Sequence, residues 1–110
     1  MVLIMSMHDS PLAQPKNIFF GHLLSALSGL IVLKIFGNNI FCLGLGVGLA
    51  IFLMMITKTI HPPAGGNPLI VILTGESFLF IFTPIIIGST LIIIYAIVFN
   101  RVVGRRYPIT

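Results

Sequence analysis

Charged residues are scarce in this sequence. Only 7% of the 110 residues are Asp, Glu, Lys or Arg, whereas 57% are hydrophobic. An ordinary globular domain has roughly a quarter of its residues charged, because its surface is in contact with water. The composition therefore excludes a soluble domain and indicates an integral membrane protein.

Cysteine is nearly absent as well. The single Cys42 lies in an apolar run, which excludes an internal disulfide framework and a thiolate metal cluster. The histidines and acidic residues are not spaced as metal ligands, and His8 beside Asp9 is at best a surface pair. We therefore expect no metal, no cofactor and no enzymatic activity, since a single histidine without a nearby acid or nucleophile supports little chemistry.

The chain is short and carries no basic patch. Its 110 residues leave room for one compact domain of a few membrane spans, so we treat residues 1–110 as a single transmembrane domain. The net charge of +4 comes from basic residues that stand singly or at segment ends, without interleaved aromatics. This pattern does not indicate nucleic-acid binding, and the partner we expect is the lipid bilayer. The leading "MVLIMSM" lacks the basic segment of a secretory signal.

Three apolar stretches are candidates for full transmembrane helices. They run from Ile18 to Phe36, from Ile40 to Thr57 and from Phe78 to Phe99, close to the ~20 residues that a helix needs to cross a bilayer. A further apolar stretch from Ala64 to Thr74 is too short to cross as a helix by itself. The sequence thus predicts an all-α polytopic membrane protein with three full transmembrane helices plus a broken or half helix.

The positions of the basic residues predict the topology, because short cytoplasmic loops are enriched in Lys and Arg. Arg101, Arg105 and Arg106 place the C-terminus in the cytoplasm, and Lys16 and Lys58 are expected on the same side of an inner or plasma membrane. The chain after Lys58 must then cross once more, and an extended stretch followed by a half helix reaches about 30 Å. The alternative is a hairpin that dips into the membrane and returns, which would place the arginine-rich tail outside.

The break in this crossing contains most of the candidate binding residues. Prolines end the preceding helical direction, and the two glycines lie in the first turn of a new helix, where unpaired amides and the helix dipole attract an anion. A histidine and an asparagine add side-chain donors. Each feature also has a structural explanation, namely a kink, close helix packing or a buried histidine. The candidates are His61, Pro62, Pro63, Ala64, Gly65, Gly66 and Asn67.

A second polar interruption precedes the first predicted span. Its candidate binding residues are Ser10, Gln14, Asn17 and His22. The chain shows a weak internal echo, in which apolar, polar and spanning segments recur, and the first and third spans are predicted to run in opposite directions. Inverted repeats of this kind place a binding site at their interface. In that interpretation, residues 1–6 are the tail of a first broken helix whose beginning is missing.

Small residues recur within two of the predicted spans. In "GLGVG" the spacing of Gly44 and Gly48 suits close helix packing rather than a phosphate loop. In the third span, small and polar residues form either a polar seam or a helix interface. These residues are Thr83, Pro84, Gly88 and Ser89.

Several motifs resemble those of the HPP family of integral membrane proteins. "HPPAGG" stands at 61–66, "SPLAQPKN" at 10–17, "GHLLSAL" at 21–27 and "NRVVGRRYP" at 100–108, so the resemblance runs from about residue 9 to the end. The resemblance implies nitrite transport across cyanobacterial or chloroplast membranes. The chain lacks the C-terminal CBS domains of some members. It also lacks the membrane segment and most of the Gly-Ala-rich stretch that usually precede "SPLAQP", so we expect an N-terminally truncated domain.

The function we expect is transport of a small inorganic anion, with nitrite implied by the resemblance. The substrate would be held at a broken-helix N-terminus rather than by a buried permanent charge. A homo-oligomer or a partner membrane subunit is expected to complete the assembly. The alternative is a truncated or accessory membrane protein that acts through helix-helix assembly and transports nothing.

Overall fold

The computed structural model describes residues 2–109, and every regular element in that range is helical. The all-α prediction is confirmed for these residues. The elements, in chain order, are α1 (Val2–Ser6), η1 (Pro11–Ala13), α2 (Pro15–Phe36), α3 (Ile40–Ile56), η2 (Pro62–Gly66), α4 (Asn67–Thr74), η3 (Ile81–Ile86) and α5 (Ile87–Val102).

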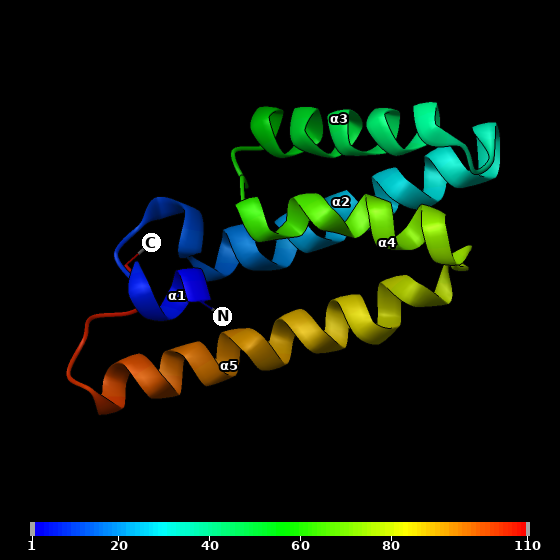
Figure 1. Cartoon of the computed structure of the whole chain (residues 1–110). Helices are drawn as coiled ribbons and strands as arrows, with labels where there is room; N and C mark the ends of the chain where they lie inside the picture. Colours follow the sequence, from blue (N-terminus) through cyan, green and yellow to red (C-terminus); the bar gives the residue numbers. More distant parts are fainter. Residues whose placement is uncertain (1, 110) are drawn as a thin grey trace.

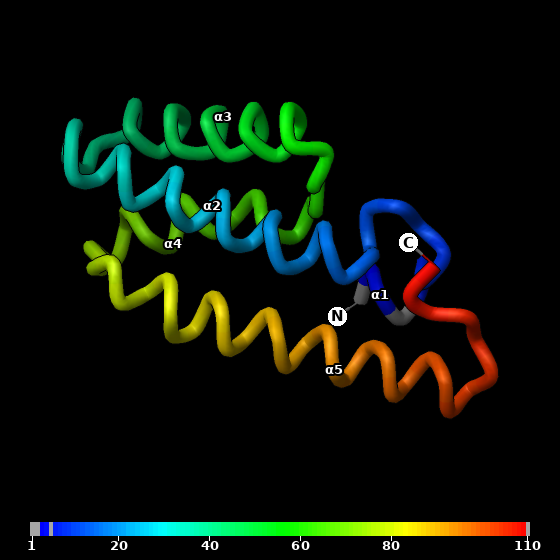
Figure 2. The backbone as a smooth tube through the Cα atoms, turned by 180° about the vertical axis from the view of Figure 1, so that it is seen from behind, coloured from blue at the N-terminus to red at the C-terminus, as the bar shows by residue number. Residues whose placement is uncertain are grey.

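The helices form an elongated bundle around α2. Figure 1 shows α3 returning antiparallel to α2, α4 running back in the direction of α2, and α5 running in the opposite direction. The view from behind in Figure 2 shows the same order. Helix α2 contacts α3, α4 and α5, and the bundle measures 47 × 24 × 19 Å. The predicted opposite directions of the first and third spans are confirmed, while the repeat relation between the two halves stays a prediction.

The outer surface of the bundle carries many large apolar side chains. Phe41, Leu79 and Val102 are 84%, 73% and 78% exposed. Such a surface would drive association in water, because contiguous apolar patches on soluble monomers are small. It suits a protein whose outer face contacts lipid tails.

Two helices, rather than the predicted three, have the length of a full membrane span. Helix α2 and the continuous stretch Ile81–Val102 each contain 22 residues and are apolar enough to cross. Helix α3 has only 17 residues, which corresponds to about 25 Å against a hydrocarbon core of about 30 Å. Its length is fixed by its ends. The Asn39 side chain caps it by accepting from the Cys42 amide at 3.1 Å, and Lys58, two residues beyond its last residue, adopts a φ of 57°.

The last span begins later than predicted and is kinked. Helical residues begin at Leu79 instead of Phe78, and Thr83 interrupts the helix with an extended backbone at φ −136° and ψ 116°. The cause is Pro84, since the ring of a proline clashes with a helical conformation of the residue before it. Regular α-helix resumes at Ile87.

The predicted half helix is present, but its regular part is shorter than expected. Helix α4 covers eight residues from Asn67, not from Ala64, and ends where Gly75 adopts the left-handed conformation with φ 67°. The preceding Pro62–Gly66 turn is a tighter 3-10 helix, a form that is common in short pieces at helix ends. Eight residues rise only about 12 Å, so α4 cannot cross a bilayer alone.

The start of α2, the segment after α3 and the C-terminal residues, which carry the basic side chains used to predict the topology, lie at one end of the bundle. Beside Lys16, the Asn17 side chain donates to the Ile60 carbonyl at 2.6 Å, which brings the segment after α3 to the start of α2. The C-terminal arm, residues 103–109, returns to the same end, where the Tyr107 hydroxyl donates to the Ala13 carbonyl at 2.8 Å. The relative placement predicted from the charges is confirmed, and the assignment of that end to the cytoplasm stays a prediction.

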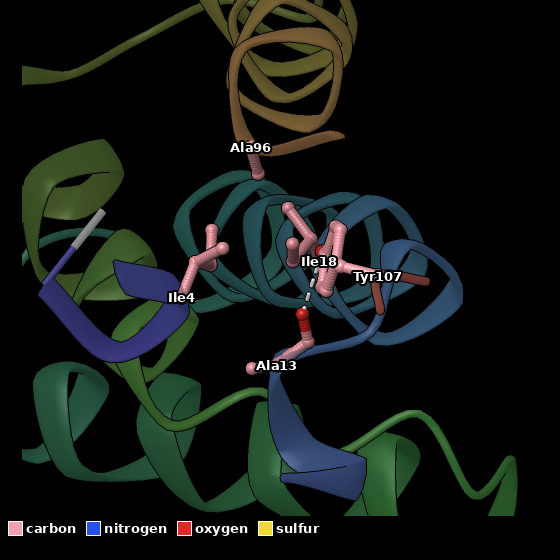
Figure 3. Packing of buried hydrophobic residues seen from close by; sticks show 5 residues of the cluster. All are labelled: Ile4, Ala13, Ile18, Ala96 and Tyr107. Atoms are coloured by element: carbon pink, nitrogen blue, oxygen red, sulfur yellow. Dashed lines mark hydrogen bonds between the residues drawn. The ribbon is translucent and has the colours of Figure 1, made fainter. Parts of the chain in front are cut away.

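The C-terminal arm closes a small apolar core at this end. Figure 3 shows the Tyr107 ring among Ile4, Ala13, Ile18 and Ala96, so the arm meets α1, η1, α2 and α5 there. Burial raises the pKa of Tyr107 to about 12 from its ordinary value of 10.0. The neutral phenol is thus the favoured form, and its contribution to stability is present below pH 10.0 and lost as pH rises through about 12.

Removing this hydroxyl should loosen the arm. Tyr107→Phe leaves the Ala13 carbonyl without its donor, so we expect a loss of ~1 to 2 kcal/mol in the free energy of unfolding. Tyr95→Phe is the matched control, because Tyr95 is 54% exposed on α5. Thermal unfolding of both variants in detergent measures the difference. Equal melting temperatures for the two variants would contradict the assigned role of the hydroxyl.

Close packing of α4 against α2 depends on Gly29. A Cβ at this position would lie 2.8 Å from the Pro68 Cα and 3.1 Å from the Val71 Cβ. On α3, Gly46 makes a similar approach to Ile72, at 3.0 Å. The glycines predicted to mediate close packing, Gly44 and Gly48, are exposed and would meet nothing within 4 Å. That prediction is wrong for packing within this chain, because the buried face of α3 contains Gly46, which lies two residues from each of them.

Alanine at position 29 should force the two helices apart. The contact is with backbone, which cannot rotate away, so Gly29→Ala is expected to destabilise by ~1 to 3 kcal/mol despite the better helix propensity of alanine. Gly44→Ala, on an open surface, should be neutral or stabilising. Thermal unfolding in the same detergent compares the two. A Gly29→Ala variant as stable as wild type would show that α4 does not pack this closely.

Candidate functional site

A cavity of about 340 Å³ lies between α2, α4 and the kinked last helix. Its position follows from the sequence of the last span, where Pro84 bends the helix and Gly88 has no side chain to fill the space. Ser89 also lines it, whereas Thr83 is exposed and does not. The lining residues are His22, Asn67, Ile70, Phe80, Pro84, Ile85, Gly88, Ser89 and Ile92.

A polar pair stands on the wall of this cavity. The Asn67 amide nitrogen, on the first residue of α4, is 2.8 Å from Nδ1 of His22 and donates to the Ser25 hydroxyl oxygen at 3.0 Å. Ser25 in turn donates to the His22 carbonyl at 3.0 Å. Since an amide NH2 group only donates, Nδ1 of His22 accepts, and the neutral ring carries its hydrogen on Nε2. No described hydrogen bond uses this N–H.

His61 lies directly behind His22, outside the cavity lining. The two rings meet edge to face with centroids 5.2 Å apart. Nδ1 of His61 is 2.8 Å from the Leu12 carbonyl, and because a carbonyl only accepts, this nitrogen carries the hydrogen and Nε2 has the lone pair. Gly21 makes room for the ring, since a Cβ there would lie 2.7 Å from the Cβ of His61.

The other candidates before α2 hold the backbone and do not line the cavity. Gln14 is fully buried, donates to the His8 and Ser10 carbonyls at 3.0 and 2.8 Å, and accepts from the Ile109 amide at 2.9 Å. The Ser10 hydroxyl accepts from the Leu12 amide at 3.2 Å and caps η1. Together with Asn17, described above, these residues place the start of α2 against the segment after α3.

The glycine turn also lies away from the cavity lining. Pro62, Pro63 and Gly66 are exposed, and a Cβ at Gly65 or Gly66 would meet nothing within 4 Å. Ala64 is buried against α3 with Ala50 and Met54. The turn leads directly into α4, whose first residue is Asn67. Anion binding by the amides of the two glycines stays a prediction.

The accessible wall of the cavity is almost entirely apolar, and its described lining residues include no permanent cation. Among its described lining residues, His22 alone is titratable, and none is Lys or Arg. Helix α4 begins at Asn67 on the wall, but the Asn67 backbone amide donates to the Ala64 carbonyl, so the unpaired amides of this helical run lie earlier, in the turn Pro62–Gly66. Sequence reasoning missed Ser25, although it lies three residues after His22 and so on the same face of α2.

The comparisons with known proteins agree with the transmembrane architecture. Residues 1–108 match the family described as HPP, transmembrane region. Two transmembrane proteins of Dictyostelium discoideum are 38% and 39% identical to the chain, each over 98% of its length. The chain spans only 41% and 38% of these relatives. No solved structure is significantly similar to it.

Proposed function

This chain belongs to the HPP transmembrane-region family, and on that premise we propose that it transports a small inorganic anion across the membrane. Nitrite, implied by the motifs at 61–66 and 10–17, is the substrate we expect. The anion would bind in the cavity between α2, α4 and α5, beside His22 and Asn67.

The observation that carries this proposal is the position of the discontinuous helix. Helix α4 begins inside the bundle, and its first side chain, Asn67, meets His22 at the cavity wall. In several transporter folds, half helices end at the substrate site and direct their N-termini at anionic groups. A broken backbone at membrane depth is tolerated where protein or a water-filled cavity covers it.

The hydrogen bonds around His22 favour a small anion acceptor. Asn67 donates to Nδ1 of His22, so the free hydrogen on Nε2 can donate to a ligand oxygen. The rest of the lining is largely apolar, with Ile70, Phe80 and Ile85 among its members. An apolar lining strengthens the few polar contacts made within it.

Uptake into proteoliposomes tests the proposal. The purified chain, reconstituted into vesicles at neutral pH, should take up labelled nitrite faster than protein-free vesicles do. Vesicles containing heat-denatured protein control for leaks. Uptake no faster than in the controls would reject transport by this chain.

The exposed face of α3 favours a second candidate function, assembly with another membrane protein. Gly44 and Gly48 point outward with Leu45 between them, and a helix shorter than the bilayer is relieved by association. In this case Gly48→Leu should abolish a cross-linked oligomer in membranes, and no nitrite uptake should be found for wild type.

A further inference from the structure

We infer that each anion crosses together with a proton, which is held by His61 behind the anion site. This inference rests on the proposed transport function and names the form in which the substrate travels. It predicts that transport moves no net charge, because the single negative charge of the anion is balanced on the protein by one proton.

The described lining of the cavity contains no fixed positive charge. The described lining residues include no Lys and no Arg. A bare anion in a low-dielectric cavity is strongly disfavoured unless a counter-charge accompanies it. The partial charge at the end of α4 is too small to balance a full negative charge. A titratable group beside the cavity can supply the missing charge by binding a proton.

The two histidines differ in their ability to accept that proton, because their Nδ1 atoms make different hydrogen bonds. Nδ1 of His22 already accepts a hydrogen bond from the Asn67 amide at 2.8 Å. A proton on this nitrogen would point at the amide hydrogens and break that bond. His61 is arranged in the opposite way. Its Nδ1–H donates to the Leu12 carbonyl at 2.8 Å, and that bond is kept and strengthened when Nε2 gains a proton.

The proton step involves one bond. The lone pair on Nε2 of His61 forms an N–H bond with an incoming proton, the ring becomes an imidazolium, and the anion beside His22 keeps its charge. On release, the proton leaves Nε2 and the anion leaves the cavity. The two ring centroids lie 5.2 Å apart, so an imidazolium at His61 disfavours a second proton on His22 and attracts an anion beside His22 from a greater distance than this.

The surroundings of His61 contribute no carboxylate to compete with the anion. From α2, His22 faces its ring, and from η1 the Leu12 carbonyl lies 2.8 Å from Nδ1. The charged or titratable side chains close to these segments and just after α3 are either exposed or half-buried: His8, Asp9, Lys16 and Lys58.

Proteoliposomes with a controlled pH gradient and membrane potential test the inference. For wild type we expect labelled nitrite uptake to rise with a pH gradient, acid outside, to consume one proton per nitrite, and to ignore a potassium diffusion potential. Protein-free vesicles give the background from diffusing nitrous acid. Nitrite uptake that follows the membrane potential would overturn proton coupling while leaving transport intact, whereas no uptake at all would reject transport itself.

A substitution assigns the proton to its residue. His61→Asn keeps an amide donor near the position of Nδ1, for the Leu12 carbonyl, and removes the titratable nitrogen. We expect its nitrite uptake to lose the response to the pH gradient, and His8→Asn, in the loop before η1, to keep it. A His61→Asn variant with the full response would overturn the assignment. If this variant fails to fold, the wild-type measurement with imposed potential still decides between coupled and uncoupled transport.

Discussion

Gly88→Leu is expected to abolish nitrite uptake without unfolding the protein. Position 88 lines the cavity, and a Cβ there meets only the Pro84 Cβ, at the ordinary contact distance of 3.9 Å. The leucine side chain can therefore be accommodated by extending into the cavity, where it occupies the space that the anion needs. We expect uptake in proteoliposomes to fall by at least about 100-fold, since a blocked site leaves no route that avoids hydrocarbon.

The same helix offers the matched control. Thr90 is exposed on the outer face of α5, so Thr90→Leu adds the same side chain toward lipid and should transport like wild type. Both variants should elute as the wild-type protein does in size-exclusion chromatography. Normal uptake by well-folded Gly88→Leu would place the transport route elsewhere.

Asn67→Asp should be nearly as severe, for an electrostatic reason. Aspartate has almost the shape of asparagine, but it cannot donate to Nδ1 of His22 and it brings a negative charge to the first residue of α4. A like charge beside a bound anion costs several kcal/mol, so we expect about a 100-fold loss of nitrite affinity. Binding measured in detergent and uptake in vesicles should fall together.

Asn38→Asp controls for added negative charge. Asn38 is exposed in the turn between α2 and α3, and its substitution should leave binding unchanged. If Asn67→Asp binds nitrite as tightly as Asn38→Asp, the end of α4 is not where the anion sits.

Local features of the sequence were sufficient for the main elements. The apolar run ending at Phe36 predicts α2, and the structure adds only one turn before Ile18, begun by Pro15. The prolines and glycines at 62–66 predict the break before α4, because each imposes a backbone constraint that acts within a residue or two. Lys16 and Lys58 predict the shared end of the bundle.

Helix lengths and hydrogen-bond partners were harder to predict, because they depend on contacts between residues that are distant in sequence. Hydropathy alone made α3 a full span, although its cap at Asn39 and its end at Ile56 leave it short. His61 was identified as polar and central, but its bond to Leu12 spans 49 residues and has no local signal. The hydrogen bond from Tyr107 to Ala13 joins residues 94 apart in the sequence, and hydrophobic periodicity does not predict it either.

The two candidate groups recognised in the sequence contribute one residue each to the cavity wall. His22 comes from the first polar interruption and Asn67 from the second; His61 packs against His22 outside the lining, and the remaining candidates fix the backbone or lie away from the cavity. The reason is geometric, since α4 runs beside α2 and only its first turn is level with His22. Sequence analysis could identify the polar segments but not which of their side chains would meet.

Protection of a single cysteine tests most directly whether the anion occupies this cavity. Ser89 is buried on the α5 wall, and Ser89→Cys in a Cys42→Ala background places one thiol there. Nitrite should slow its modification by a small thiol reagent, at concentrations that also saturate uptake, whereas sulfate should not. Equal modification rates with and without nitrite, in a protein that still transports it, would contradict the account.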